Sequence, residues 1–279
     1  KKGFLEDDYI GSALVDVYAK CRSIADARSV FNELSSQNVV SWTALITGLA
    51  EQGKGEEALQ CFEQMHVKGI LPNTATLLGI LKACGSIEAA KNVEAIYSEI
   101  STNGLLEDIS IGNAVMDMYS RRGALLKAQE VFDNLVCRDI ISWTSLIGGY
   151  AKHGKGIEAL VCFEKMRKEG ISPDSVTFVS VLKACSNVRA IDKGKQIHDE
   201  VVKRKLLEKN IVIGTALVHM YATCGMLEKA RKVLEELHLR DVIAWSALIA
   251  GYAQQGQGHE ALKCLKHMES EGISTDNIR

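Results

Sequence analysis

Residues 140–174, IISWTSLIGGYAKHGKGIEALVCFEKMRKEGISPD, carry the pattern that decides the fold. Apolar residues recur at helical spacing over 146–150, and a second amphipathic run covers 159–166 after the break Gly154-Lys155-Gly156. Gly170 is typical of a helix end, where the chain needs a left-handed residue, and Pro173 follows outside the helix. The stretch therefore predicts a hairpin of two helices.

The same stretch returns at 39–73 and 242–276, and its tryptophans, Trp42, Trp143 and Trp245, are 101 and 102 residues apart. Related segments lie between these copies, one kind at 8–38, 109–139 and 211–241 and another at 74–108 and 175–210. A single hairpin of about 35 residues cannot bury its apolar face, whereas stacked hairpins can. The repeats therefore predict an all-α solenoid that forms one array along the chain.

The bulk composition excludes several classes of protein. Of the 279 residues, 47% are hydrophobic and 24% are charged, the net charge is −2, and there are two prolines. These values indicate a globular chain with long helices. No run approaches 18 apolar residues, so we expect no membrane-spanning helix. The near-neutral charge argues against a protein that holds nucleic acid by bulk positive charge.

We expect no catalytic residue, metal or cofactor in this chain. The eight cysteines contain no Cys-x-x-Cys pair, which argues against a zinc knuckle or a redox dithiol. His198-Asp199-Glu200 matches half of a zinc deaminase signature, but the Pro-Cys-x-x-Cys half is absent.

Several residues are expected to serve the fold rather than a site. The three tryptophans should be core anchors, and Ser23-x-x-Asp26 resembles a capping box that starts a helix. Cys137 should be exposed, whereas seven cysteines at repeat-equivalent positions should be reduced and packed in the core: Cys21, Cys61, Cys84, Cys162, Cys185, Cys224 and Cys264.

Taken together, the motifs SWTALITG, GYAKHGKGIEALVCFEKMRKEGISPD, VSVLKAC, GKQIH and DMYSRRGALLKAQEVFDNL resemble pentatricopeptide repeats (PPR). The order of the units resembles the PLS subfamily, the triplet arrays of plant organelle proteins. It gives S-type units at 8–38, 109–139 and 211–241, P-type units at 39–73, 140–174 and 242–276, and L-type units at 74–108 and 175–210. Residues 1–7 would end an earlier L-type unit, and 277–279 would begin another. The resemblance implies a right-handed superhelical α-solenoid.

The resemblance also implies that each repeat contacts one base of single-stranded RNA through its fifth and last residues. An ionised Asp only accepts hydrogen bonds and suits the ring N–H of G or U, whereas an Asn amide can donate to A or C. With the pairing preferences of the family, the hypothesis is 5′-AA?UG?GG-3′. The pairs are Ser12/Asn38, Thr43/Asn73, Leu78/Asp108, Asn113/Asp139, Thr144/Asp174, Val179/Asn210, Thr215/Asp241 and Ser246/Asp276. The two L-type pairs are left unassigned, because Leu78 and Val179 cannot form side-chain hydrogen bonds.

Two further sets of residues are implied in the same way. The second residue of each repeat would pack on a base face, and the apolar ones are Tyr9, Val40, Ile141, Val176, Val212 and Ile243. Basic residues near the end of the first helix would contact phosphate weakly, and they are Lys20, Arg121 and Lys152. A purely structural role for these polar residues stays open as an alternative, because Ser, Thr and Asn near a helix start are often plain N-caps.

By resemblance, the protein is expected to be a site-recognition factor for C-to-U RNA editing in a mitochondrion or chloroplast, with a targeting segment outside this chain. It would not itself be an enzyme, because deaminase activity would come from a C-terminal domain outside this chain or from a partner. Editing cofactor proteins would be further partners, and no membrane is expected. The alternatives are an RNA processing or stability factor, and a protein-binding scaffold of the tetratricopeptide kind, which the alternation of repeat lengths disfavours.

Overall fold

The computed structural model describes residues 8–85, 90–208 and 210–273, without the side chains of 90–92. Over these residues the regular secondary structure is helical and contains no strand. The chain divides into two compact units, one ending at Arg138 and the other beginning at Asp139, and each is described by itself.

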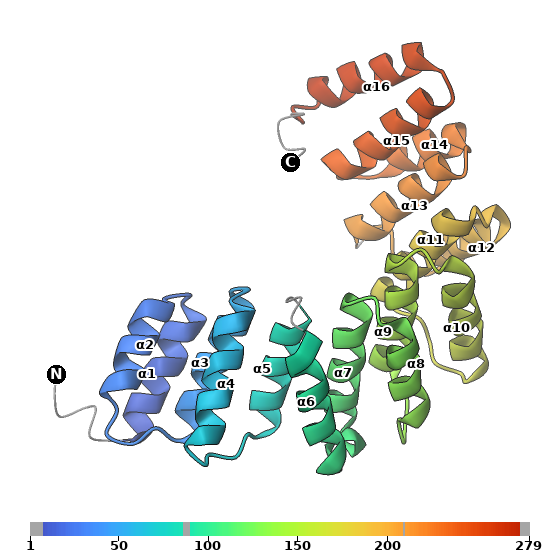
Figure 1. The fold of residues 1–279 in the computed structure, drawn as a ribbon. Coiled ribbons are helices and arrows are strands. Elements are labelled where there is room, and N and C mark those ends of the chain that lie inside the picture. The colour runs from blue at the N-terminus through green and yellow to red at the C-terminus, as the bar shows by residue number, and fades with distance from the viewer. Residues whose placement is uncertain (1–7, 86–89, 209, 274–279) are drawn as a thin grey trace. The chain divides into compact units, whose positions relative to one another are not determined.

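The first unit is a row of helical hairpins (Figure 1). Helices α1, α3, α5 and α7 pack side by side in that order, and the even-numbered helices lie against their own hairpin partners. The helices are α1 (Asp8–Lys20), α2 (Ile24–Glu33), α3 (Val39–Glu51), α4 (Gly55–Val67), α5 (Thr74–Cys84), α6 (Ala90–Thr102), the short 3₁₀ helix η2 (Leu105–Glu107), α7 (Ile109–Arg121) and α8 (Leu125–Asn134).

The second unit repeats this arrangement, with α9, α11, α13 and α15 packed side by side. Its helices are α9 (Ile140–Lys152), α10 (Gly156–Lys168), α11 (Ser175–Val188), α12 (Ile191–Lys203), α13 (Ile211–Thr223), α14 (Leu227–Glu236), α15 (Val242–Gln254) and α16 (Gly258–Ser270). Each odd-numbered helix begins at the first residue of a unit that the sequence predicts. The expectation of an all-α solenoid of stacked hairpins is confirmed.

Local signals explain where the helices begin and end. The first helix of a hairpin starts after an Asn or Asp whose side chain accepts backbone N–H groups, so that donors left over at the helix N-terminus are satisfied. These N-caps are Asn38, Asn73, Asp108, Asp139, Asp174, Asn210 and Asp241. At the other end, Gly170 follows α10 with φ +78°, a left-handed conformation that favours glycine.

The second helices begin differently, and one sequence expectation is wrong. Ser23 precedes α2 but makes no capping hydrogen bond to the backbone, and its hydroxyl instead donates to Asp26 Oδ2 at 2.5 Å. The capping box therefore does not form, because the tight turn after α1 leaves Ser23 outside the extended backbone typical of an N-cap (φ −95°, ψ 70°).

The core is formed where the two helices of a hairpin meet the next hairpin. Trp42, Trp143 and Trp245 are at most 3% exposed, as expected of core anchors. Five of the seven cysteines predicted to pack in the core are buried, and Cys137 is exposed as predicted. The prediction is wrong for Cys21, which is exposed, and for Cys224, which is half-buried. Both follow a first helix directly and lie in the turn rather than on its packed face.

The structure also bears on membrane spans, metal sites and reactive cysteines. None of the helices in the described part of the chain is long and apolar enough to span a bilayer. In the same residues, no group of three or more His, Cys, Asp or Glu side chains is placed to hold a metal ion. Burial raises the pKa of Cys84 to about 11 and that of Cys185 to about 12, so these thiols stay protonated and unreactive at neutral pH.

Candidate nucleic-acid interface

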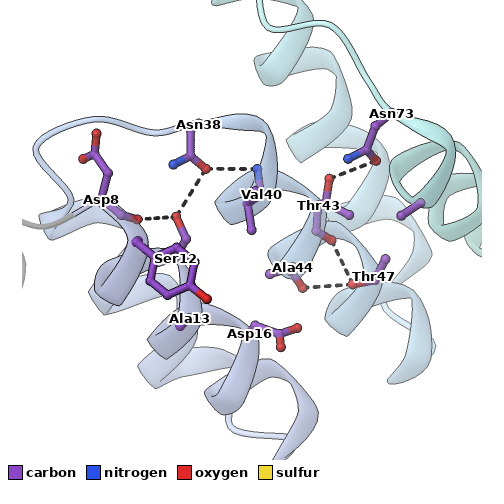
Figure 2. A pocket seen from close by; sticks show the side chains of 12 residues that line it. Asp8, Ser12, Ala13, Asp16, Asn38, Val40, Thr43, Ala44, Thr47 and Asn73 are labelled. Carbon is purple, nitrogen blue, oxygen red and sulfur yellow. Dashed lines mark hydrogen bonds between the residues drawn. The ribbon is translucent and has the colours of Figure 1, made fainter.

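A groove of about 510 Å³ runs along the first helices of the first unit (Figure 2). Side chains from α1 and α3, together with residues at the start of α5, form its walls. It is lined by Asp8, Tyr9, Ser12, Ala13, Asp16, Asn38, Val40, Thr43, Ala44, Thr47, Asn73 and Ala75. The second, fifth and last residues singled out by the sequence for the first two repeats therefore lie in one groove.

Asn38 shows how a last residue is held. Its Oδ1 accepts a hydrogen bond from the Val40 N–H at 3.0 Å and lies 3.2 Å from Ser12 Oγ, whose single proton is shared with the Asp8 carbonyl at 2.7 Å (Figure 2). The Ser41 N–H also donates to Oδ1, at 3.1 Å. Because these donors converge on the oxygen, the amide nitrogen is the group that remains to donate to a ligand. N-capping therefore sets which polar atom of the side chain is available in the groove.

The pair Thr43/Asn73 is joined through a third residue. Thr43 Oγ1 lies 3.5 Å from Asn73 Oδ1 but only 2.6 Å from Thr76 Oγ1, and Thr76 donates to Asn73 Oδ1 at 2.9 Å. In the second unit, Thr177 joins Thr144 to Asp174 in the same way. Every described last residue is an N-cap, so the alternative of a purely structural role is partly right. In the two pairs Thr43/Asn73 and Thr144/Asp174, however, the N-cap is also connected to the fifth residue.

The remaining pairs differ. Thr215 donates directly to Asp241 Oδ2 at 3.0 Å. Asn113 is 7% exposed in α7 of the first unit, whereas its predicted partner Asp139 caps α9 of the second. Ser246 donates to the Val242 carbonyl at 2.6 Å, and its predicted partner Asp276 lies outside the described residues.

The apolar second residues form an exposed series. Each lies in the first turn of its helix, two residues after the N-cap where the cap is described. Large apolar side chains that are exposed at repeated positions are a feature of binding surfaces rather than of the core. Their exposed fractions are 85% for Tyr9, 54% for Val40, 57% for Ile141, 61% for Val176, 54% for Val212 and 62% for Ile243. The predicted base-packing residues are therefore available to a ligand, next to the polar pairs.

The predicted phosphate contacts are less open than the sequence suggested. Lys20 pairs with Asp16 at 2.6 Å and Arg121 with Asp117 at 2.7 Å, both one helical turn away. The contact with Asp16 raises the pKa of Lys20. Lys152 is exposed and forms no ion pair within the described part of the second unit. Of these three predicted contacts, Lys152 is thus the one that forms no ion pair with a carboxylate described in its own unit.

Sequence reasoning missed Thr76 and Thr177, the third residues of the two L-type units. Both are fully buried and both complete capping boxes, with Asn73 and Asp174 respectively. The signal was present, because an Asn or Asp followed three residues later by Thr is compatible with a reciprocal cap. The additional contact of each Thr to the fifth residue of the preceding repeat could not be read from that spacing.

Comparison with known families gives two alternating matches. A model described as the PPR repeat family matches residues 37–86, 138–187 and 240–278, and one described as the PPR repeat matches 12–39, 113–140 and 215–242. Both recur at the same interval of 101 and 102 residues. Together the two models account for most of the chain.

The curated relatives are plant proteins. A chloroplastic pentatricopeptide repeat-containing protein of Arabidopsis thaliana is 36% identical over 99% of this chain and 45% of its own length. A mitochondrial one, named as putative in the same plant, is 35% identical over 97% of this chain and 43% of its own length. The chain thus spans less than half the length of these relatives.

Solved structures show the same fold. The crystal structure of the maize pentatricopeptide repeat protein PPR10 superposes with a TM-score of 0.77 at 18% identity, covering 96% of this chain and 40% of the maize chain. The same maize protein in complex with an 18-nucleotide psaJ RNA element gives a TM-score of 0.82 at 19% identity, covering 96% of this chain and 41% of the other.

Proposed function

Since this chain belongs to the pentatricopeptide repeat family, we propose that it binds single-stranded RNA with one base per repeat. The observation that carries the proposal is the groove itself, where an exposed apolar second residue lies beside a fixed polar pair in each of two successive repeats. Unstacked bases need both parts, an apolar surface for the ring face and hydrogen-bonding groups for the base edge. The RNA bound by the maize protein of the same fold supports this choice of ligand.

The proposed site is 5′-AA?UG?GG-3′. The amide nitrogen that N-capping leaves to Asn38 suits the ring-nitrogen acceptor of adenine, and the carboxylate of Asp174 suits the ring N–H of guanine. Affinity should depend mainly on base contacts, because the net charge is −2 and two of the three predicted phosphate contacts are paired with carboxylates.

The whole protein is proposed to be a PLS-type site-recognition factor for C-to-U editing of organellar transcripts. The interval of 101 and 102 residues between matches of one kind supports the triplet order, and the names of chloroplastic and mitochondrial relatives support an organelle. A deaminase domain or partner would then supply the chemistry.

Equilibrium binding of the chain to two labelled RNAs tests the proposal. We expect the RNA that contains AA?UG?GG to bind at least tenfold more tightly than one with the same bases in permuted order. Equal affinity for the two RNAs would contradict base reading by the repeats, and binding to neither would contradict RNA binding.

A further inference from the structure

A chain of hydroxyl groups links two neighbouring repeats of the second unit. Thr144 Oγ1 lies 2.7 Å from Thr177 Oγ1, which lies 2.8 Å from Asp174 Oδ1. The Thr177 N–H also donates to Asp174 Oδ1 at 2.8 Å. Thr177 thus contacts both residues of the preceding base-specifying pair, although it belongs to the next repeat.

Counting protons fixes the direction of this chain. The Asp174 carboxylate only accepts hydrogen bonds at neutral pH, so Thr177 must use its single hydroxyl proton to donate to Asp174. Thr144 must then donate its own proton to Thr177 across their 2.7 Å contact. No proton of Thr144 remains for a ligand, which would meet Thr144 as an acceptor.

We propose that Thr177 is a positioning residue that sets the hydrogen-bonding polarity of the preceding repeat, a role that rests on the proposed RNA binding. By taking the proton of Thr144 and fixing Oδ1 of Asp174, it leaves two acceptors for a ligand, Thr144 Oγ1 and Asp174 Oδ2. The Watson–Crick edge of guanine carries two adjacent donors, the ring N1–H and the 2-amino group, whereas uracil carries one. The pair therefore selects guanine.

The equivalent residues of the first unit give a different polarity. Thr76 contacts Thr43 at 2.6 Å and donates to Asn73 Oδ1 at 2.9 Å, so that the amide nitrogen of Asn73 is left as the donor. Thr43 is also 2.6 Å from the Val39 carbonyl, so its proton stays within the protein whichever neighbour receives it. An acceptor beside a donor matches the amino group and N1 of adenine.

A repeat without this third residue shows what Thr177 contributes. Ala244 stands at the corresponding position after Thr215/Asp241, and there Thr215 donates directly to Asp241 Oδ2 at 3.0 Å. That bond takes up one of the two lone pairs of Asp241 Oδ2, whereas the hydroxyl chain makes no use of the corresponding oxygen of Asp174. The two Thr/Asp pairs thus present different acceptors although their fifth and last residues are identical.

The test replaces guanosine by inosine, which lacks the 2-amino group, at the fifth nucleotide of the proposed site. For the unsubstituted chain we expect guanosine to be preferred about 5- to 10-fold, as for one hydrogen bond. Thr177→Val keeps the side-chain shape but lacks the hydroxyl, and it should reduce the preference below about 2-fold. Thr177→Ser restores the hydroxyl and should retain the preference.

The control Thr76→Val removes the equivalent hydroxyl from the first unit and should leave the guanosine preference at the fifth nucleotide unchanged. If Thr177→Val fails to fold, as shown by its circular dichroism, Thr144→Val removes the acceptor itself and should abolish the preference. Three results would overturn the proposal. The guanosine preference could survive Thr177→Val or Thr144→Val, it could be lost in Thr177→Ser, or it could be lost in the control Thr76→Val.

Failure of the proposed function gives a different result. If the unsubstituted chain does not discriminate the proposed RNA from its permuted form, RNA reading and the role of Thr177 are both wrong. If the unsubstituted chain discriminates the two RNAs but one of the overturning results is found, for example a guanosine preference that survives Thr177→Val, only the role of Thr177 is wrong.

Discussion

Thr144 Oγ1 lies 2.7 Å from Thr177 Oγ1, although the two residues are 33 positions apart in the chain. The contact exists because α9 and α11, the first helices of two successive repeats, pack side by side. A residue that we propose to specify a base in one repeat is therefore held by the repeat that follows it. Substitutions at either of two successive repeats should therefore affect the same base contact.

The fifth residue should determine base choice at its own nucleotide. Thr144→Asn creates an Asn/Asp pair, which the family preferences assign to uracil, so preference at the fifth nucleotide should shift from G toward U. Binding to four RNAs that differ only at that nucleotide measures the shift. An unchanged base preference would show that the register of repeats on the RNA is wrong.

The exposed second residues should contribute to affinity but not to stability. Ile141→Ser removes apolar surface from a side chain that is 57% exposed, and we expect RNA affinity to fall about 3- to 10-fold, since apolar surface covered by a base contributes about 25 cal/mol per Å². The free energy of unfolding should change by less than about 0.5 kcal/mol.

The control for Ile141 is Ile157→Ser at the start of α10, where the side chain is 66% exposed but lies on a second helix. Its RNA affinity should match that of the unsubstituted chain. Equal losses from both substitutions would indicate a general effect of surface apolarity rather than a base contact.

Phosphate attraction should depend on which cations are already paired. Lys152→Gln should reduce the slope of log affinity against log salt by about 0.7, the value for one phosphate contact on a single strand. Lys20→Gln should reduce it less, because Asp16 lies 2.6 Å from that ammonium group.

Asp16→Asn provides the reciprocal test, since Asp16 lines the groove. Removing its charge should release Lys20 and raise RNA affinity at low salt. An unchanged or lower affinity of Asp16→Asn would indicate that Lys20 does not face the RNA backbone.

Close contact between first helices should make one glycine essential for packing. A Cβ on Gly48 of α3 would lie 2.6 Å from Ala19 Cβ of α1. Gly48→Ala should therefore reduce the free energy of unfolding by about 1–3 kcal/mol through overpacking, although alanine favours helix by about 1 kcal/mol. Gly258→Ala at the start of α16 meets open space and should be neutral or slightly stabilising. Urea denaturation measures both, and equal effects would contradict the packing argument.

The stability of the protein should fall in mild acid. Burial lowers the pKa of His198 and of His219 below the ordinary 6.5, and the carboxylates of Asp199 and Glu236 offset this only in part for His198. Below about pH 6.5 the unfolded chain binds more protons at these sites than the folded chain does, so acid favours unfolding. The stabilising contribution is complete above pH 6.5 and is lost as the pH falls through the lowered values.

Urea denaturation at pH 7.5 and pH 5.5 measures this effect. His198→Asn should show a smaller difference between the two pH values than the unsubstituted chain, whose His198 Nδ1 lies 2.9 Å from the Tyr221 hydroxyl. A pH dependence that is identical in the two proteins would exclude His198 as a source of the effect.

Much of the fold could be predicted because its signals are local. The apolar spacing of 146–150 and 159–166 and the break at Gly154 determine a hairpin without reference to the rest of the chain. Burial was harder to predict. Cys21 and Cys224 share a repeat position with each other but lie in turns, where small shifts of the backbone decide which way a side chain points.

The sequence by itself determined the repeat period and the two-helix unit, because helical periodicity, N-caps and turn glycines act within a few residues. Only the tertiary structure decided which residues of neighbouring hairpins touch. The bond from Thr144 to Thr177, the different bond from Thr215 to Asp241 and the close approach of Gly48 to Ala19 depend on how one hairpin packs against the next. Such packing joins residues about 30 positions apart and follows from the combined shape of both helices, so no short stretch of sequence specifies it.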